Sequence, residues 1–176
     1  GTRCALEHGG MAPTFLTEST NLDSASKLLV KGGFYHAGQV CVSVQRIFVH
    51  KNIFEDFLHI FEKKLKPLKI GNPLDNKTEI GPLIRPSEVD RIEEWVNETT
   101  FKGTKVLCGG KKISETCFDK TVLINPKFSD RVSRKEIFGP VVNIYSYDDL
   151  NKTIEIANDT DVSFQASIFS NDIDQT

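Results

Sequence analysis

Three short segments of this sequence combine side chains that can do covalent chemistry with glycines that let a ligand come close to the backbone. They are Glu7-His8-Gly9-Gly10, Gly38-Gln39-Val40-Cys41 and Glu136-Ile137-Phe138-Gly139-Pro140. A cysteine thiolate is a nucleophile, and a carboxylate can serve as a general base. Glycine adopts backbone conformations that other residues resist. The three segments therefore suggest a reaction on a small molecule.

The residues around Cys41 decide how it is interpreted, because a lone cysteine is commonly a small buried core residue. It follows a predicted helix that ends in glycines, and Gly38 lets the chain turn just before it. We therefore expect Cys41 at the entry to a new element. Backbone N–H groups there would face a reacting carbonyl group and favour the thiolate form of the side chain.

The two carboxylates have simpler alternative interpretations. Glu7 can be a solvated charge, although Gly9 and Gly10 follow it. Glu136 stands before a Gly-Pro pair and an apolar run, and it can be an exposed carboxylate paired with Arg134 or Lys135. Taken alone, the segment around Glu136 favours the interpretation as an exposed ion pair.

Helical periodicity predicts the elements that would position these segments. A first helix is expected from Asn21 and Asp23 to near Gly32 and Gly33, and a second over 54–65, where Pro67 stops it. A third helix is expected after Ser87, with Asp90 as a capping-box residue and Gly103 as its end. A fourth is expected over about 149–158. Strands are expected at 45–50, Val106, 121–124, 141–147 and 166–169, and a long loop at 71–86. This alternation predicts one α/β domain over 1–176, with a largely parallel sheet flanked by helices.

Composition and charge restrict the kind of partner. The chain has 22 basic and 24 acidic residues, a net charge of −2, which gives no basic patch for nucleic acid or an anionic membrane. The apolar runs Arg46–His50 and Pro140–Tyr147 fall far short of the ~20 residues that span a bilayer. Cys4, Cys41, Cys108 and Cys117 form neither a paired framework nor a C-x-x-C site, which favours reduced thiols, a cytoplasmic location and no metal. A small-molecule partner is expected.

Five blocks of the sequence, in order, resemble the aldehyde dehydrogenase superfamily. The family's Glu-Leu-Gly-Gly segment is matched by Glu7 to Gly10, and its Gly-Gln-x-Cys segment by Gly38 to Cys41. The remaining blocks are Gly71-Asn72-Pro73-Leu74-Asp75 with Gly81-Pro82-Leu83-Ile84, then Leu107-Cys108-Gly109-Gly110, then Glu136 to Pro140. The resemblance runs from near Ala5 to the end of the chain and implies the catalytic domain of that fold.

The resemblance also implies a chemistry. Cys41 would add to an aldehyde to give a thiohemiacetal, which loses hydride to NAD or NADP and becomes a thioester. Glu7 would be the general base that activates water to hydrolyse the thioester. Glu136 would accept hydrogen bonds from the nicotinamide ribose, Phe138 would pack near it, and Gly10 is assigned to the same cofactor site.

Two departures from the family pattern and one expected omission accompany this resemblance. His8 replaces the usual Leu, and 161–166 replaces a Tyr-Gly-Leu pattern. We expect the chain to be a fragment that lacks most of the nucleotide-binding domain, the Asn of the oxyanion site and the oligomerisation arm. Its expected partners are an aldehyde and the missing nucleotide-binding half, in a parent that is a homo-oligomer. The fragment alone is expected to be inactive.

Two other function classes remain open at this point. The chain could be a non-catalytic structural or interaction domain that keeps the fold, and His8 and the segment around Ser163 are the hints for it. It could also be a cysteine hydrolase in which Cys41 works with a histidine, of which His36 is the nearest in sequence. No further residues of hydrolase machinery are evident.

Overall fold

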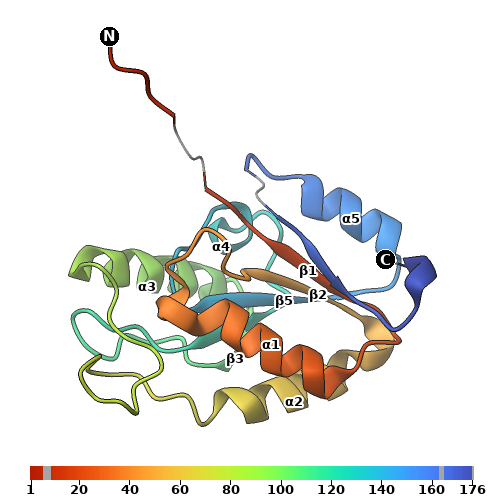
Figure 1. Ribbon diagram of the computed structural model, residues 1–176, viewed down its shortest axis with the longest axis horizontal. Helices are drawn as coiled ribbons and strands as arrows, with labels where there is room; N and C mark the ends of the chain where they lie inside the picture. Colours follow the sequence, from red (N-terminus) through yellow and green to blue (C-terminus); the bar gives the residue numbers. More distant parts are fainter. Residues whose placement is uncertain (6–8, 163–164, 176) are drawn as a thin grey trace.

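Strands from both ends of the chain meet in one six-stranded sheet of order β3-β4-β5-β2-β1-β6. The computed structural model describes residues 1–5, 9–162 and 165–175 (Figure 1). The strands are β1 Pro13–Leu16, β2 Arg46–His50, β3 Lys105–Cys108, β4 Thr121–Ile124, β5 Val141–Tyr147 and β6 Ser167–Phe169. Neighbouring strands are parallel except for the β3–β4 pair. The predicted α/β class with a largely parallel sheet is confirmed.

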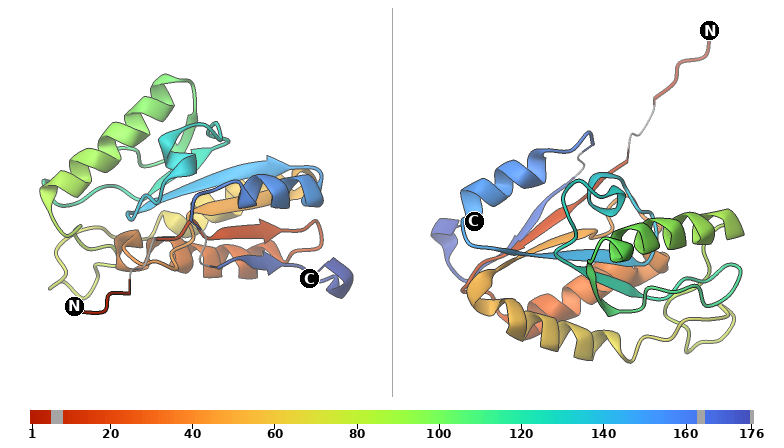
Figure 2. Two further views of the ribbon diagram at one scale, coloured as in Figure 1. Left: turned by 90° about the horizontal axis from the view of Figure 1, so that it is seen from above. Right: turned by 180° about the vertical axis from the view of Figure 1, so that it is seen from behind.

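Helices cover both faces of this sheet. They are α1 Leu22–Phe34, α2 Phe54–Leu65, α3 Pro86–Phe101, α4 Arg131–Arg134 and α5 Leu150–Asn158, with short 3-10 turns at Tyr35–Gly38, Lys51–Ile53 and Ile173–Gln175. Helices α1 and α2 lie together on one face, and α5 lies on the other (Figures 1 and 2). Helix α3 lies beside the β3 end of the sheet (Figure 2).

Alternation along the strands explains why both faces are covered. In β2, Ile47 and Val49 join the large core cluster beneath α1 and α2. Phe48, between them, points to the other face, where its ring stacks on Phe15 at 5.2 Å and on Tyr145 at 5.1 Å. Successive strand residues face opposite sides, so a strand with apolar residues on both must be buried on both.

Most predicted elements are present with small shifts at their ends. Helix α1 begins after Asn21, whose side-chain oxygen accepts a 3.0 Å hydrogen bond from the Ser24 amide, and it ends at Phe34, just past Gly33. The long loop carries no helix or strand between α2 and α3. Strand β1 and helix α4 were not predicted: β1 opens with a proline, which is rare inside strands, and the four residues of α4 make little more than one helical turn.

The predicted capping box of the third helix is wrong. Helix α3 begins two residues earlier than predicted, at Pro86, with Arg85 and not Ser87 at the N-cap and with no side-chain capping bond. Proline suits the first helical position because its missing N–H would have no partner there. Asp90 instead pairs with Lys112 at 2.6 Å. Among the helices that the structure describes, none has the length and apolar character to cross a bilayer.

Candidate active site

The candidate segments lie at the amino ends of three neighbouring parallel strands. Gly9 and Gly10 precede β1, Cys41 precedes β2 and Glu136 precedes β5, and the sheet order places these strands as β5-β2-β1. Parallel neighbours run in the same direction, so their amino ends share one edge of the sheet. Segments separated by up to 126 residues therefore meet in space, as the hydrogen bond from Gly10 to Glu136 shows.

The nucleophile segment touches the Glu136 segment through two glycines. Gly38 has φ +71°, in the left-handed region, and a Cβ built on it would overlap the carbonyl oxygen of Gly139. His36 and Ala37 before it also have positive φ, at 50° and 56°. Three consecutive left-handed residues turn the chain sharply after α1 and deliver Cys41 to the sheet edge.

Glu136 is held by the backbone at the start of β1. Its Oε1 accepts a 3.0 Å hydrogen bond from the Gly10 amide, and a Cβ on Gly9 would lie 2.7 Å from its Oε2. The alternative interpretation of Glu136 as a surface ion pair is wrong. Arg134 pairs with Asp159 at 2.9 Å, and Lys135 pairs with Asp161 at 3.1 Å.

Cys41 lies half-buried in the turn between the 3-10 turn Tyr35–Gly38 and β2, as expected for the entry to a new element. The Ser43 amide donates to the Val40 carbonyl at 2.9 Å and closes this turn. The turn opens onto a cavity of about 440 Å³, which is lined by Gly9, Gln39, Val40, Cys41, Glu136 and Phe138. The structure thus brings a thiol, a carboxylate and an aromatic ring to one cavity.

Phe138 is exposed although its side chain is large and apolar. It keeps 42% of its surface accessible, and its φ of 51° lies in a region that bulky residues seldom adopt. Backbone strain of this kind gathers at ligand sites, where the surrounding structure enforces it. Both features fit a ring presented to a ligand at the cavity mouth.

His36 lies outside the Cys41 cavity. It lines a neighbouring hollow of about 920 Å³ formed with the long loop, together with Tyr35 and Pro82. Its exposed ring rests against Tyr35, with centroids 4.9 Å apart. His36 and Cys41 thus line different hollows, which does not favour a hydrolase that uses both.

Several sequence-predicted positions lie outside the described residues. These are Glu7, the proposed general base, its neighbour His8, and Ser163 with Phe164 in the segment that departs from the family pattern. Gly9 and Gly10, which follow Glu7 directly, are placed beside Glu136. Among the described residues there is also no cluster of three or more His, Cys, Asp or Glu side chains that could hold a metal ion.

Sequence reasoning missed the polar side chains that fix these segments. Gln39 bridges to the long loop: its Nε2 donates to the Pro82 carbonyl at 3.2 Å, and its Oε1 accepts from the Ile84 amide at 2.9 Å. Gln45 and Arg46 are buried at the start of β2. A polar pair that opens an otherwise apolar strand was a usable signal, because buried polar groups need partners.

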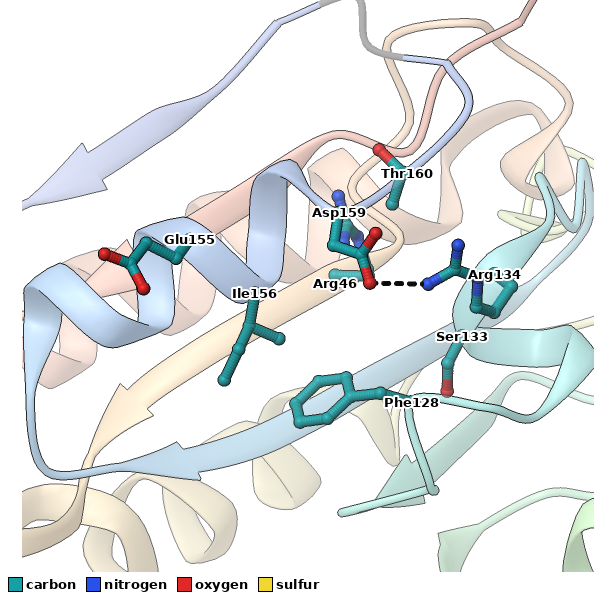
Figure 3. Close-up of a pocket in the computed structure, with 8 residues that line it drawn as sticks. All are labelled: Arg46, Phe128, Ser133, Arg134, Glu155, Ile156, Asp159 and Thr160. Carbon is teal, nitrogen blue, oxygen red and sulfur yellow. Dashed lines mark hydrogen bonds and ion pairs between the residues drawn. The ribbon is translucent and has the colours of Figure 1, made fainter.

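Arg46 lines a second cavity, of about 320 Å³, on the α5 side of the sheet (Figure 3). Its guanidinium donates to the carbonyls of Met11 and Ala157, at distances of 2.7 to 3.1 Å. Burial lowers the pKa of this guanidinium below its usual value. The dashed contact in Figure 3 is the Arg134–Asp159 ion pair. Arg46 therefore ties the chain just after Gly10 to β2 and to the end of α5.

An α/β domain that gathers a cysteine, a carboxylate and an exposed aromatic ring in one cavity is of the class that supports covalent catalysis on a small ligand. The family description that matches the chain is the aldehyde dehydrogenase family, over residues 1–176. The chain belongs to the aldehyde dehydrogenase family, and the resemblance predicted from the five sequence blocks is confirmed.

Named relatives fit this assignment. The chain is 40% identical over 171 residues to a 3-sulfolactaldehyde dehydrogenase of Priestia aryabhattai, covering 97% of this chain and 36% of the relative. It is 37% identical over 174 residues to a lactaldehyde dehydrogenase of Methanocaldococcus jannaschii, covering 99% of this chain and 37% of the relative. The chain thus spans little more than a third of the length of these relatives.

Solved structures show the same fold. A glyceraldehyde-3-phosphate dehydrogenase of Methanocaldococcus jannaschii, complexed with NADP, superposes with a TM-score of 0.90 at 36% identity, covering 95% of this chain and 36% of the other. Aldehyde dehydrogenase 21 of Physcomitrella patens, in complex with succinate, also gives 0.90, at 35% identity and with coverage of 95% and 35%.

Proposed function

We propose that residues 1–176 form the catalytic domain of an NAD(P)-dependent aldehyde dehydrogenase that oxidises an aldehyde to a carboxylic acid. The observation that carries this proposal is the shared cavity, in which Cys41 lies with Glu136 and Phe138. Family membership supplies the reaction class. The 3-sulfolactaldehyde and lactaldehyde dehydrogenases among the relatives support a short polar aldehyde as the substrate.

Cys41 acts as the nucleophile. Its thiolate adds to the aldehyde carbon, a carbon–sulfur bond forms and the carbonyl oxygen becomes an oxyanion, which backbone N–H groups of the turn stabilise. Hydride then leaves that carbon, and a thioester on Cys41 remains. Glu7 takes a proton from water, the resulting hydroxide attacks the thioester carbon, and the acid leaves as the Cys41 thiolate is restored.

The residues of the cavity suit a nicotinamide cofactor. Glu136 uses Oε1 for the Gly10 amide, and no described residue donates to its Oε2, which leaves that oxygen for a ribose hydroxyl. Phe138 presents an exposed ring beside it. Gly9 supports the fit, because a Cβ there would occupy the space next to Oε2. NAD or NADP, when bound, accepts the hydride.

Further partners belong to the same proposal. The chain spans little more than a third of its relatives, and the remaining length in those relatives would supply the nucleotide-binding half. We expect that half to bind against this domain, and the complete protein to be a homo-oligomer.

An acyl-transfer experiment tests the nucleophile and the base without the cofactor. An activated ester such as p-nitrophenyl acetate should acylate Cys41, as peptide mass spectrometry would show, and the acyl group should then hydrolyse. Glu7→Gln should slow that hydrolysis by on the order of 100-fold, the usual size of a general-base contribution. Glu115→Gln, which changes an exposed carboxylate, is the control. Acylation of other residues in preference to Cys41, or equal hydrolysis in both variants, would contradict the proposal.

A further inference from the structure

The buried side chain of Gln45 makes three hydrogen bonds, all of them to one distant segment of the chain. It is 5% exposed at the start of β2. Its Nε2 donates to the carbonyls of Val132, at 3.2 Å, and Lys135, at 2.8 Å. Its Oε1 accepts from the Ile137 amide at 2.9 Å. These partners lie 87 to 92 residues away along the chain.

Two of the hydrogen-bond partners of Gln45 flank Glu136 in the sequence. The Lys135 carbonyl lies on one side of it in sequence and the Ile137 amide on the other, so one carboxamide fixes the backbone at both of its neighbours. That backbone determines where the Glu136 carboxylate lies, and the carboxylate reaches the Gly10 amide at 3.0 Å. Gln45 is not among the residues that line the Cys41 cavity, but it lines a small adjoining pocket together with Glu136 and Phe138.

No pairing between β5 and β2 fixes the backbone at Glu136. Strand β5 begins only at Val141, and its first contact with the β2 region is the hydrogen bond from the Asn143 amide to the Gln45 carbonyl, at 2.8 Å. A carboxamide carries one acceptor and an N–H donor, as a backbone peptide does. The Gln45 side chain therefore continues the pairing of its own main chain past the end of the ladder, to the segment that bears Glu136.

We propose that Gln45 is a positioning residue, whose buried carboxamide sets the place of the Glu136 carboxylate in the cofactor cavity. The proposal rests on the proposed function in one respect: Glu136 is the contact for the cofactor ribose. Gln45 acts through the Glu136 segment and is not itself assigned a contact with substrate or cofactor. A residue of similar shape without the amide would leave the Lys135 carbonyl and the Ile137 amide without their partner, whereas the Val132 carbonyl would keep its hydrogen bond from Nδ2 of Asn143.

Backbone amide hydrogen exchange, measured by NMR on the labelled chain, tests the positioning. Gln45→Met keeps the side-chain length but removes the hydrogen bonds. We expect the Gly10 and Ile137 amides to exchange at least about tenfold faster in this variant, while Ile84 is unchanged. Gln39→Met is the matched control, because Gln39 holds the Ile84 amide instead. It should accelerate Ile84 and leave Gly10 and Ile137 unchanged.

The exchange rates of the amides within β5 serve as a reference, because a general loss of stability would accelerate them together with Gly10, whereas a local change at Glu136 would not. If Gln45→Met accelerates the β5 amides by the same factor as Gly10, or leaves Gly10 unchanged, the positioning role is wrong. Should Gln45→Met fail to fold, Gln45→Asn retains the polar group on a side chain one methylene shorter. It should still accelerate Gly10 relative to β5, and an unchanged ratio would overturn the proposal.

A titration with NADP at millimolar concentration distinguishes this proposal from the function on which it rests. In the unmodified chain we expect the Gly10 amide resonance to move, and in Gln45→Met the apparent Kd to rise about tenfold. If no resonance near Glu136 moves in the unmodified chain, the cofactor contact of the proposed function fails. The exchange result would still decide whether Gln45 positions Glu136.

Discussion

At the residue scale, glycine is required where two segments of the site touch. Gly38 combines positive φ with a position against the carbonyl of Gly139, so both its conformation and its missing side chain matter. This contact brings the turn that carries Cys41 against the segment that carries Glu136. A side chain at position 38 would push the two apart and widen the cavity.

Gly38→Ala should therefore destabilise the chain by about 2 to 4 kcal/mol, from the left-handed conformation and the overlap together. Two other glycines separate these causes. Gly103→Ala adds strain without overlap, since Gly103 has φ +98° and open space around it, and it should cost about 1 kcal/mol. Gly81→Ala meets neither problem. Urea unfolding measures all three, and equal stability of the Gly38 and Gly81 variants would contradict the argument.

The four cysteines should differ in reactivity towards iodoacetamide near neutral pH. Burial raises the pKa of Cys108 to about 11, so this thiol should react appreciably only as the pH approaches that value. Cys117 is buried and Cys4 is exposed. Cys41 should be alkylated first, because it opens onto a cavity beside a closed turn. Peptide mass spectrometry gives the order, and a Cys41 that reacts last would remove it as the nucleophile.

At the element scale, α3 is tied to the short helix that precedes Glu136. Arg131 in α4 donates from Nε to Oε2 of Glu98 at 2.6 Å, and its guanidinium also pairs with Glu94 at 2.7 Å. The same guanidinium lies over the ring of Trp95, 5.6 Å from its centroid. Helix α3 thus presents two carboxylates and an indole to one arginine, and so braces the segment that leads to the site.

These contacts give α3 a dependence on pH. Hydrogen bonds from Lys102 and Arg131 hold the pKa of Glu98 below its usual value near 4.5. A carboxyl group whose pKa is lowered by folding contributes stability above its unfolded pKa, and this contribution is lost as the pH falls through the lower folded value. Glu98→Gln should therefore lower Tm at pH 7 by a small amount, since exposed pairs are weak.

The difference in Tm between Glu98→Gln and the unmodified chain should shrink towards zero as the pH falls below the lowered pKa of Glu98 in the folded chain. Thermal unfolding followed by circular dichroism over a pH series measures it. Glu115→Gln, which changes an exposed carboxylate, should show little difference at any pH. A difference that stays constant through the pH at which Glu98 becomes protonated would mean that Glu98 acts through packing rather than charge.

Elements with a clear apolar pattern could be predicted from the sequence, including the four-residue strand β4, whereas β1 and α4 could not. Helix α2 shows its apolar stripe at Phe54, Phe57, Leu58, Phe61 and Leu65, all of which are buried. Strand β1 has four residues and opens with a proline, so only its pairing with β2 and β6 identifies it. Proline is tolerated there because the first strand residue needs no ladder donor.

The candidate site was predictable in its parts but not in its connections. The resemblance of their segments to the family assigned roles to Cys41 and Glu136, and their meeting depended on β5, β2 and β1 being neighbours. Arg134 and Lys135 are adjacent to Glu136 in sequence, yet tertiary contacts give each another partner. The place of Gln45 is likewise set by a segment about 90 residues away, which no local pattern encodes.

At the scale of the whole molecule, the site occupies the edge of the sheet where parallel strands begin. Open α/β sheets commonly bind ligands at the carboxyl ends of their strands. Here Gly10, Cys41 and Glu136 all precede their strands, so the cavity opens at the opposite edge. A nucleotide-binding half would have to approach this edge to bring a nicotinamide to Cys41.

If this domain normally binds a nucleotide-binding half, the isolated chain should self-associate through the surface that this half would cover. The chain exposes large apolar side chains, among them Leu74, Ile84, Phe101, Phe138 and Ile173. Light scattering over a concentration series should show an apparent mass that rises with concentration. Alternatively, the chain should bind the separately produced remaining length of a parent protein. A monomer at high concentration that also binds no apolar dye would argue against an uncovered interface.

The isolated chain should not reduce NAD or NADP with any aldehyde at the rate of an ordinary enzyme, although Cys41 and Glu7 are both present. From the family resemblance, we expect the Asn donor to the oxyanion and the dinucleotide loop to lie outside these 176 residues. Loss of one oxyanion donor typically costs ~3 to 4 kcal/mol of transition-state stabilisation. Loss of cofactor positioning removes an advantage on the order of 7 to 11 kcal/mol in favourable cases.

Glu136 and Phe138 would contact one ribose and its surroundings, which leaves the adenine and the pyrophosphate without partners in this chain. Nicotinamide absorbance should therefore stay flat for the chain alone and rise when the remaining length of a parent protein is added. Cys41→Ala should abolish the restored activity, while Cys117→Ala, at a buried cysteine away from the cavity, controls for loss of a thiol. Appreciable turnover by the chain alone would show that these 176 residues position the cofactor without further help.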